Sequence, residues 1–425
     1  MGIFESVLMF FGLLLFGWPI HISMGIPACV WLIISPDSPG FILAQRIFSA
    51  HDSFSLMAIP FFMLSGQMME ETGITEALMD FANSVVGHIR GGLAHTVSLT
   101  GIMFAAVSGS GNASAAAIGS TMLPALKKSG YDAGHAASII ASAGALGPII
   151  PPSIFIVIYC NATGSNVGDM FMAGVIPGVI MGFGFMIVNY VYAKKRNVPV
   201  AAFKGFRLIF SKLTTAIWAL FMPFIIIGGI VSGIFTATEA GAVACIYSLF
   251  YGIVTRRLKL KRIKVCLIEA AVASVGPMLL ISVSTVFAYM LTIYGTDKIV
   301  ANFVLNYMNN TYLFYLFILF LGLLMGCFID SIASTLMLIP ILMPIVRAMG
   351  LDFLHFSIVF SLAFLTCTIT PPVGTILYVV CGIDNTPVSL VMKPIIPYVL
   401  VMMLVIILVI FFPSVGVWLP MALKR

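Results

Sequence analysis

Charged side chains are scarce in this chain, at 8% of 425 residues, whereas apolar residues make up 61%. A soluble domain carries about 25% charged residues, so this composition excludes an ordinary soluble enzyme or binding domain. The seven cysteines form no CxxC pair and the six histidines no HExxH motif, so no zinc spacing is present. No serine, histidine and acid arrangement typical of nucleophilic catalysis is visible, and we expect no enzyme activity.

Apolar runs dominate what is present. A run of about 20 apolar residues spans a bilayer, and a backbone in hydrocarbon must satisfy its own hydrogen bonds, so we predict an all-α polytopic membrane protein. We expect about ten to twelve spanning helices plus re-entrant pieces. Such runs lie near 6–34, 55–69, 170–193, 213–234, 236–254, 265–294, 312–329 and 395–412.

Basic residues gather in two short clusters rather than along a surface stripe. Positive loops stay on the cytoplasmic side of a membrane, so we place both clusters there. Room for two spans lies between them, and this even number is consistent with that placement. The clusters are Lys194, Lys195, Arg196, Lys204, Arg207 and Lys212, and then Arg256, Arg257, Lys259, Lys261, Arg262 and Lys264.

A repeat divides the chain into halves, which we take as 1–200 and 201–425. Paired broken segments in two halves are the best sequence indication of a transport site. Hydropathy leaves open whether the halves are parallel or inverted, and the basic clusters favour inversion. At a constant spacing of 220 positions, Ala113, Ser114, Pro124, Gly130, Asp132, His135, Pro151 and Pro152 recur as Ala333, Ser334, Pro344, Gly350, Asp352, His355, Pro371 and Pro372.

Small and hydroxyl residues replace bulky ones in the segment AVSGSGNAS at 106–114. A helix interrupted here exposes free carbonyls at one broken end and free amides at the other. Carbonyls coordinate a cation, and amides at a helix start attract an anion. The alternative is close helix packing through small residues. No lysine follows at P-loop spacing, so phosphate binding is not expected.

Prolines interrupt the segment GALGPIIPPS at 144–153, because each proline lacks an N–H and clashes with the preceding turn. The freed carbonyls from about Gly147 to Ile150 suit a buried Na⁺, a hard cation that takes oxygen ligands. A structural kink satisfied by hydroxyls is the alternative. The second half repeats this pattern at 326–335 and 365–372, where Cys367 stands opposite Gly147.

Asp330 is the acid that lies deep in an apolar run, opposite Ser110 in the repeat. Placing a carboxylate inside the membrane costs free energy, so we interpret such a residue first as functional. It either ligates Na⁺ or carries a proton, and the alternative is a helix cap. We interpret Glu239 as a cap residue, with Thr236 or Thr238 as its partner. Asp132 and Asp352, with the histidines that follow them, read as polar loop and cap residues.

Several ordered motifs resemble the large membrane subunit of TRAP transporters, the tripartite ATP-independent periplasmic transporters (the DctM-like family). The likeness covers nearly the whole chain. It rests on SGSG at 108–111, AAIGS at 116–120, LP at 123–124, GY at 130–131, GPIIPPS at 147–153, FTATEAGAV at 235–243 and TPPVG at 370–374.

The resemblance implies an elevator-type transporter with two inverted repeats, re-entrant helical hairpins, and a scaffold around a transport domain. Members import organic acids, such as C4-dicarboxylates and sialic acid, with a Na⁺ gradient. A periplasmic substrate-binding protein delivers the solute, and a small four-helix membrane subunit, here expected as a separate chain, completes the transporter. The resemblance therefore places this multi-pass chain in a bacterial inner membrane.

The resemblance also implies two or more Na⁺ ions. Serine and glycine are expected where this chain has Gly111 and Cys367. The first Na⁺ site falls near Ser108, Gly111, Gly147, Ile150 and Pro152, and the second near Gly326, Cys367, Thr370 and Val373, with Asp330 as a further candidate ligand.

We therefore predict a Na⁺-coupled importer subunit with hairpins at about 95–125 and 312–345 and broken helices at about 134–160 and 355–382. We expect the substrate carboxylate at the two hairpin tips. The alternatives are a self-sufficient Na⁺/dicarboxylate symporter of the same superfamily and a structural or channel-like subunit without ion coupling. The predicted substrate contacts are Ser110, Asn112, Ser331 and Ser334.

Overall fold

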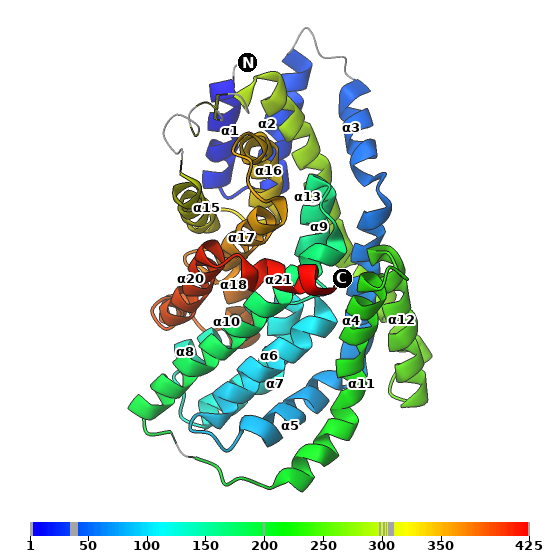
Figure 1. Ribbon diagram of the computed structural model, residues 1–425, viewed down its shortest axis with the longest axis vertical. Helices are drawn as coiled ribbons and strands as arrows, with labels where there is room; N and C mark the ends of the chain where they lie inside the picture. The colour runs from blue at the N-terminus through cyan, green and yellow to red at the C-terminus, as the bar shows by residue number, and fades with distance from the viewer. Residues whose placement is uncertain are drawn as a thin grey trace.

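Helices and their connecting loops account for the part of the chain that the structure, a computed structural model, describes: residues 3–34, 41–198, 200–296, 299–300, 302, 304 and 310–423 (Figure 1). No β-strand occurs among these residues. The prediction of an all-α fold is therefore confirmed. Helices suit an apolar chain because they pair every interior backbone group within one segment.

The first half of the chain contains short helices before a long one. In chain order they are α1 (Ile3–Leu15), α2 (Ile20–Ile34), α3 (Phe41–His51), the 3₁₀ turn η1 (Phe54–Met57), α4 (Ala58–Glu71), α5 (Ile74–Val86), α6 (Gly92–Ser108), α7 (Gly111–Lys128), α8 (Ala133–Ala145), α9 (Ile154–Thr163) and α10 (Val167–Lys195).

The second half begins with three long helices. In order they are α11 (Phe206–Val231), α12 (Ala237–Val254), α13 (Leu260–Ile293), α15 (Thr311–Gly326), α16 (Ser331–Ala348), α17 (Phe353–Leu365), the 3₁₀ turn η2 (Thr366–Ile369), α18 (Thr375–Asp384), α19 (Val388–Val391), α20 (Ile396–Phe411) and α21 (Ser414–Leu423).

Two helical hairpins face each other across the middle of the molecule. Helices α6 and α7 are joined through Gly109 and Ser110, and α15 and α16 through residues 327–330. In Figure 1, α6 and α7 lie in the lower half and α15 and α16 in the upper half. Residues of both tips line one cavity, so the hairpins approach it from opposite sides. Each hairpin is followed by a broken helix, α8–α9 and α17–α18.

Fewer helices are long enough to cross a membrane than the apolar runs predicted. By length and composition, five described helices qualify, or up to seven if two bent pairs each count as one span. This count is below the ten to twelve expected from the sequence because α6, α15 and other apolar helices have only 10–17 residues; the number of spans stays a prediction. At 1.5 Å per residue, such helices are shorter than a hydrocarbon core of about 30 Å.

Helices α11 and α12 form an antiparallel hairpin whose turn is closed by a capping box. Thr236 Oγ1 accepts the Glu239 backbone N–H at 3.3 Å, and Glu239 Oε2 accepts the Thr236 backbone N–H at 2.8 Å. The cap interpretation of Glu239 is thus confirmed, with Thr236 rather than Thr238 as its partner. This hairpin returns the chain to its starting end (Figure 1), so both basic clusters lie at one end of it.

The paired acids differ between the halves. Asp352 Oδ1 accepts the His355 backbone N–H at 2.7 Å and caps α17. Asp132 makes no cap bond. Its carboxylate instead accepts hydrogen bonds from Tyr192 at 2.9 Å and Arg196 at 3.1 Å. The first acid therefore links the α7–α8 loop to the basic end of α10.

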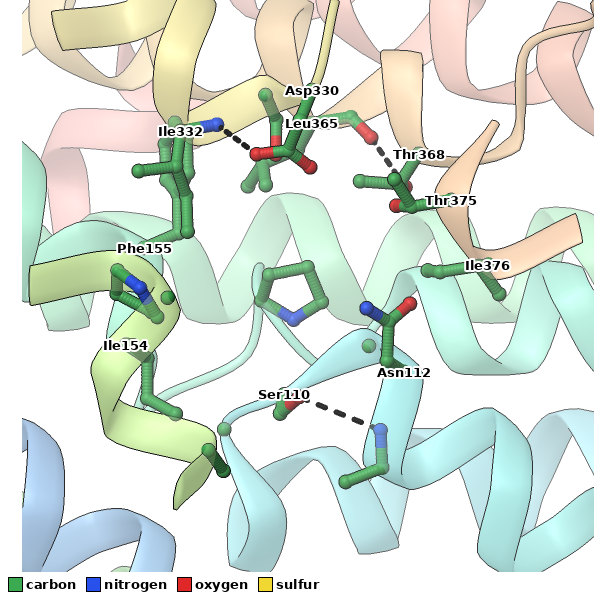
Figure 2. A pocket seen from close by; sticks show the side chains of 18 of the residues that line it. Ser110, Asn112, Ile154, Phe155, Asp330, Ile332, Leu365, Thr368, Thr375 and Ile376 are labelled. Carbon is green, nitrogen blue, oxygen red and sulfur yellow. Dashed lines mark hydrogen bonds between the residues drawn. The ribbon is translucent and has the colours of Figure 1, made fainter. Parts of the chain in front are cut away.

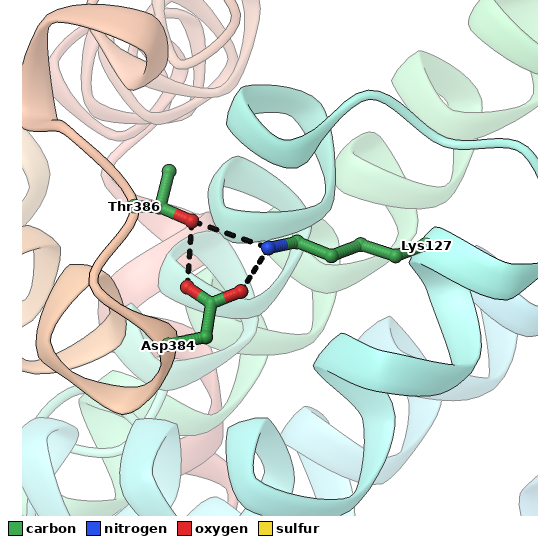
Figure 3. A network of polar contacts seen from close by, with 3 residues as sticks. All are labelled: Lys127, Asp384 and Thr386. Carbon is green, nitrogen blue, oxygen red and sulfur yellow. Dashed lines mark hydrogen bonds and ion pairs between the residues drawn. The ribbon is translucent and has the colours of Figure 1, made fainter.

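A cross-half ion pair holds the hairpin of one half to the broken helix of the other (Figure 3). Lys127, in the last turn of α7, pairs with Asp384 at the end of α18. Thr386 donates to Asp384 at 2.6 Å and lies 3.3 Å from Lys127 Nζ. Helix α18 also packs on α7 and α8. These elements form one packed group, while α4 packs chiefly on α12 and α13.

Candidate functional site

The tip of the first hairpin is a tight turn stabilised by serine side chains. Gly109 ends α6 in the left-handed conformation, with φ of +63°, which glycine adopts without steric cost. Ser110 then caps α7, because its hydroxyl accepts the Ala113 N–H at 3.4 Å. Ser108 Oγ lies 2.6 Å from Ser114 Oγ and donates to the Ser110 carbonyl at 3.2 Å. The hydroxyls thus order the tip without bulky side chains.

The proline-rich break between α8 and α9 lies directly against this tip. Its backbone meets the tip through the hydrogen bond from Ile154 N–H to the Gly109 carbonyl, at 3.3 Å. A Cβ on Gly147 would lie only 2.7 Å from the Ser110 carbonyl oxygen, so glycine is needed for this approach. Pro151 has no N–H to donate to the Gly147 carbonyl four residues back. This carbonyl is therefore free to bind another group.

The tip of the second hairpin uses an acid where the first uses a serine. Asp330 caps α16 by accepting the Ile332 N–H at 2.9 Å, and it also lines the central cavity. The cap and the membrane-embedded acid are thus the same residue. Gly326 lies against Cys367, whose thiol donates to the Gly322 carbonyl at 3.1 Å. The hydroxyl of Thr370 donates to Thr366 at 2.7 Å.

The two tips and the two breaks enclose a cavity of about 420 Å³. Figure 2 shows Asp330 and Ile332 on one side of it and Ser110 and Asn112 on the facing side. The described residues that line it are Met63, Gly109, Ser110, Gly111, Asn112, Ala113, Pro148, Ile154, Phe155, Ala273, Gly276, Pro277, Leu280, Asp330, Ser331, Ile332, Leu365, Thr368, Thr375 and Ile376.

Four helices, α7, α9, α16 and α18, begin at this cavity, since their first residues line it. Each helix N-terminus carries a partial positive charge of about +0.5 elementary charge, which favours an anion close to it. Among the described lining residues there is no lysine, arginine or histidine. An anion in this cavity would therefore meet helix N-termini and hydroxyl and amide groups rather than basic side chains.

The predicted substrate contacts are only partly brought together. Ser110, Asn112 and Ser331 line the cavity. Ser334 does not: it is fully buried, and its hydroxyl has no partner among the described residues. Ser334 follows Ser331 by three residues, so its side chain lies about one helical turn farther from the start of α16. Ser334 as a substrate contact stays a prediction.

The predicted Na⁺ ligands fall into two places beside the tips. In the first set, Gly111 and Gly147 touch through their backbones and Pro152 approaches Gly109. The side chain of Ile150 instead packs against Gly178 of α10, which leaves only its carbonyl as a potential ligand. In the second set, Gly326 and Cys367 are in contact, and the Thr370 backbone N–H donates to the Cys367 carbonyl at 3.2 Å. The ligand roles of all these residues stay predictions.

The wall of the cavity that α4 and α13 form was not predicted from the sequence. Met63 of α4 and Ala273, Gly276, Pro277 and Leu280 of α13 complete its wall. The Gly276–Pro277 pair within a long apolar run was the available signal, because proline and glycine mark helix breaks and close approaches. Nothing in the run itself indicates that this kink faces residues far away in the sequence.

Comparison with known proteins identifies the family. The family model described as "Tripartite ATP-independent periplasmic transporter, DctM component" matches residues 7–415. The chain belongs to this family. It is 37% identical over 400 residues to the C4-dicarboxylate TRAP transporter large permease protein DctM of Pseudomonas aeruginosa, covering 94% of this chain and 93% of that one. It is 34% identical to the sialic acid TRAP transporter large permease protein SiaM of Vibrio cholerae, covering 98% and 97%.

A solved structure supports the fold of this DctM-family chain. The YdaH transporter of Alcanivorax borkumensis superposes with a TM-score of 0.65, over 98% of both chains, at 13% sequence identity. So low an identity indicates a shared architecture alone. The resemblance to TRAP large subunits inferred from the motifs is confirmed, and the chain is a permease component of a multi-pass membrane transporter.

Proposed function

We propose that this permease imports organic acids into a bacterial cell, coupled to Na⁺ entry. In this proposal it lies in the inner membrane, receives its solute from a periplasmic binding protein and works with a separate small four-helix subunit. Family membership supports the partners, and the substrates in the names of two relatives, a C4-dicarboxylate and sialic acid, are both carboxylates. The observation that carries it is the convergence of four helix N-termini on one cavity.

The substrate carboxylate binds at the start of α7 and α16 in this proposal. The Ser110 hydroxyl and the Asn112 amide face the cavity from one tip, and Ser331 faces it from the other. Backbone N–H groups in the first turn of a helix have no partner within the helix, so they are available to an anion. The apolar wall, with Phe155 and Leu280, leaves room for the carbon skeleton.

Na⁺ binds in this proposal where broken helices leave carbonyl oxygens unpaired. At the first tip the ligands are the carbonyl oxygens of Gly147 and Ile150 and the hydroxyl of Ser108, which already lies within the turn. At the second tip, Asp330 adds a full negative charge beside Gly326 and Cys367. Oxygen ligands of this kind suit a hard monovalent cation.

Coupling follows because the ions and the solute use the same two tips. An ion that orders a tip removes part of the entropy cost of binding the carboxylate, and the linkage is reciprocal. The cavity lies between the hairpins and the α4–α13 wall. We extend the proposal to an elevator motion. In this motion α6–α9 and α15–α18 slide together as a transport domain along a scaffold that contains α4, α12 and α13.

Uptake by proteoliposomes tests the proposed function. The permease is reconstituted with its small subunit, and labelled carboxylates are supplied on a purified binding protein. We expect accumulation to require both an inward Na⁺ gradient and the binding protein, with at least about tenfold less uptake when choline replaces Na⁺. Equal uptake in choline would refute the Na⁺ coupling. Uptake of free solute without binding protein would favour the self-sufficient symporter. Solute flux that is independent of Na⁺ and only runs down its own gradient would favour a channel-like subunit.

A further inference from the structure

A second, narrow cavity continues from the central one along α4. It measures about 60 Å³ and shares Met63, Ser110, Ala113 and Ala273 with the central cavity. From there it passes Ser108 and reaches two polar side chains of α4, Gln67 and Glu70. The two cavities therefore adjoin at the first hairpin tip, and the second one extends from there toward the end of α4.

One face of α4 forms a wall of this passage. Gln67 and Glu70 follow Met63 by four and seven positions, a spacing that places all three on the same side of a helix. Polarity increases along this face from the central cavity outward, from a thioether to an amide and then a carboxylate. The face ends at Glu70, whose side chain is exposed.

Ser108 and Phe104 of α6 also line this cavity, and carbonyl oxygens at the end of α6 lie close to Gly66 of α4. A Cβ on Gly66 would lie 3.7 Å from the Ser108 carbonyl oxygen and 3.9 Å from that of Val107. Helix α6 ends at Ser108, so its last carbonyls lack donors within the helix. The C-terminal end of a helix also carries a partial negative charge. This end of α6 therefore attracts a cation.

Glu70 and its neighbour Glu71 differ in whether they form an ion pair. The Glu71 carboxylate pairs with Arg262 of α13, whose Nε lies 2.8 Å away. Glu70 forms no ion pair among the described residues. Arg262 belongs to the second basic cluster, which the positive-inside rule places in the cytoplasm. The passage therefore opens on the cytoplasmic side, beside an unpaired carboxylate.

Size and charge together decide what the passage admits. At about 60 Å³ this space is much smaller than the central cavity of about 420 Å³, so it suits water or a partly hydrated ion better than an organic acid. The Glu70 carboxylate also repels an anion. We propose that this passage, from Ser108 through Gln67 to Glu70, is the cytoplasmic exit of the co-transported cation, with Glu70 as its outermost ligand. The inference rests on the Na⁺ coupling proposed above.

Inhibition of uptake by Na⁺ inside the vesicle tests this passage. Internal Na⁺ rebinds through the exit and slows the return of the carrier. In Glu70→Gln we expect the internal Na⁺ concentration for half-inhibition to rise about fivefold, the effect of one unit charge at roughly 4 Å in water. The external Na⁺ concentration for half-maximal uptake should not change. Glu71→Gln is the matched control, because it removes the same charge beside Arg262 and outside the passage.

A second variant keeps the test independent of how well Glu70→Gln folds. Gly66→Ala adds a methyl at 3.5–3.9 Å from the α6 backbone, which is ordinary contact. The methyl covers the Ser108 carbonyl, so we expect the same rise in half-inhibiting internal Na⁺. The exit proposal is overturned if internal Na⁺ inhibits both variants as it inhibits the wild type, or if Glu71→Gln shows an equal change. The proposed function still stands in that case, provided that wild-type uptake depends on Na⁺. Na⁺-independent wild-type uptake overturns both.

Discussion

Replacing Gly147 with alanine is expected to reduce solute uptake at least about tenfold, because overpacking a tight contact costs about 1–3 kcal/mol. The new Cβ would lie 2.7 Å from the Ser110 carbonyl oxygen and 3.0 Å from the Gly111 nitrogen. Both neighbours are backbone atoms, so the tip itself must move. Initial uptake rates in proteoliposomes, at equal amounts of reconstituted protein, measure the effect.

Gly228→Ala is the matched control for this prediction. Gly228 lies within the apolar helix α11, and a Cβ there would meet nothing within 4 Å. We expect its uptake to match the wild type. Wild-type uptake by Gly147→Ala would show that the tip does not depend on its contact with the α8–α9 break, and the site as described would lose its first wall.

Asp330→Asn is expected to raise the external Na⁺ concentration for half-maximal uptake at least about tenfold, which corresponds to about 1.4 kcal/mol. Asparagine caps helices about as well as aspartate, so the start of α16 is preserved. What is lost is the negative charge that faces the cavity and the second candidate Na⁺ site. The measurement is uptake against external Na⁺ at fixed solute.

Asp330→Ala separates the two roles of this residue. It removes the cap as well as the charge, and losing an N-cap costs about 1 kcal/mol of stability. We therefore expect lower thermal stability in detergent for Asp330→Ala and an unchanged value for Asp330→Asn. If Asp330→Asn retains wild-type Na⁺ dependence while Asp330→Ala is impaired, Asp330 is only a cap and contributes nothing to ion binding.

Local chemistry predicted the parts of the site that belong to one segment. The prolines at 148, 151 and 152 indicated a break, and the structure has one between α8 and α9. The constant spacing of 220 residues aligned Ser110 with Asp330, and each residue caps the second helix of its hairpin. These features depend on backbone hydrogen bonding within a few residues, which sequence patterns report directly.

Sequence patterns could not predict which faces of distant helices pack against each other. Met63 and Gly276 are more than 200 positions apart, yet both line the cavity. Hydropathy is nearly uniform along apolar helices, so it does not indicate the side that faces a neighbour. The same limit applies to Ser334, whose place in a polar motif suggested that it lines the cavity, although its side chain is not among the lining residues.

A structure determined with a bound carboxylate solute and Na⁺ tests the central claim most directly. We expect the carboxylate within hydrogen-bond distance of Ser110 or Ser331 and of the free N–H groups that begin α7 and α16. No basic side chain should touch it. A carboxylate held by a lysine or arginine, or a solute bound away from both hairpin tips, would contradict the role of the helix N-termini.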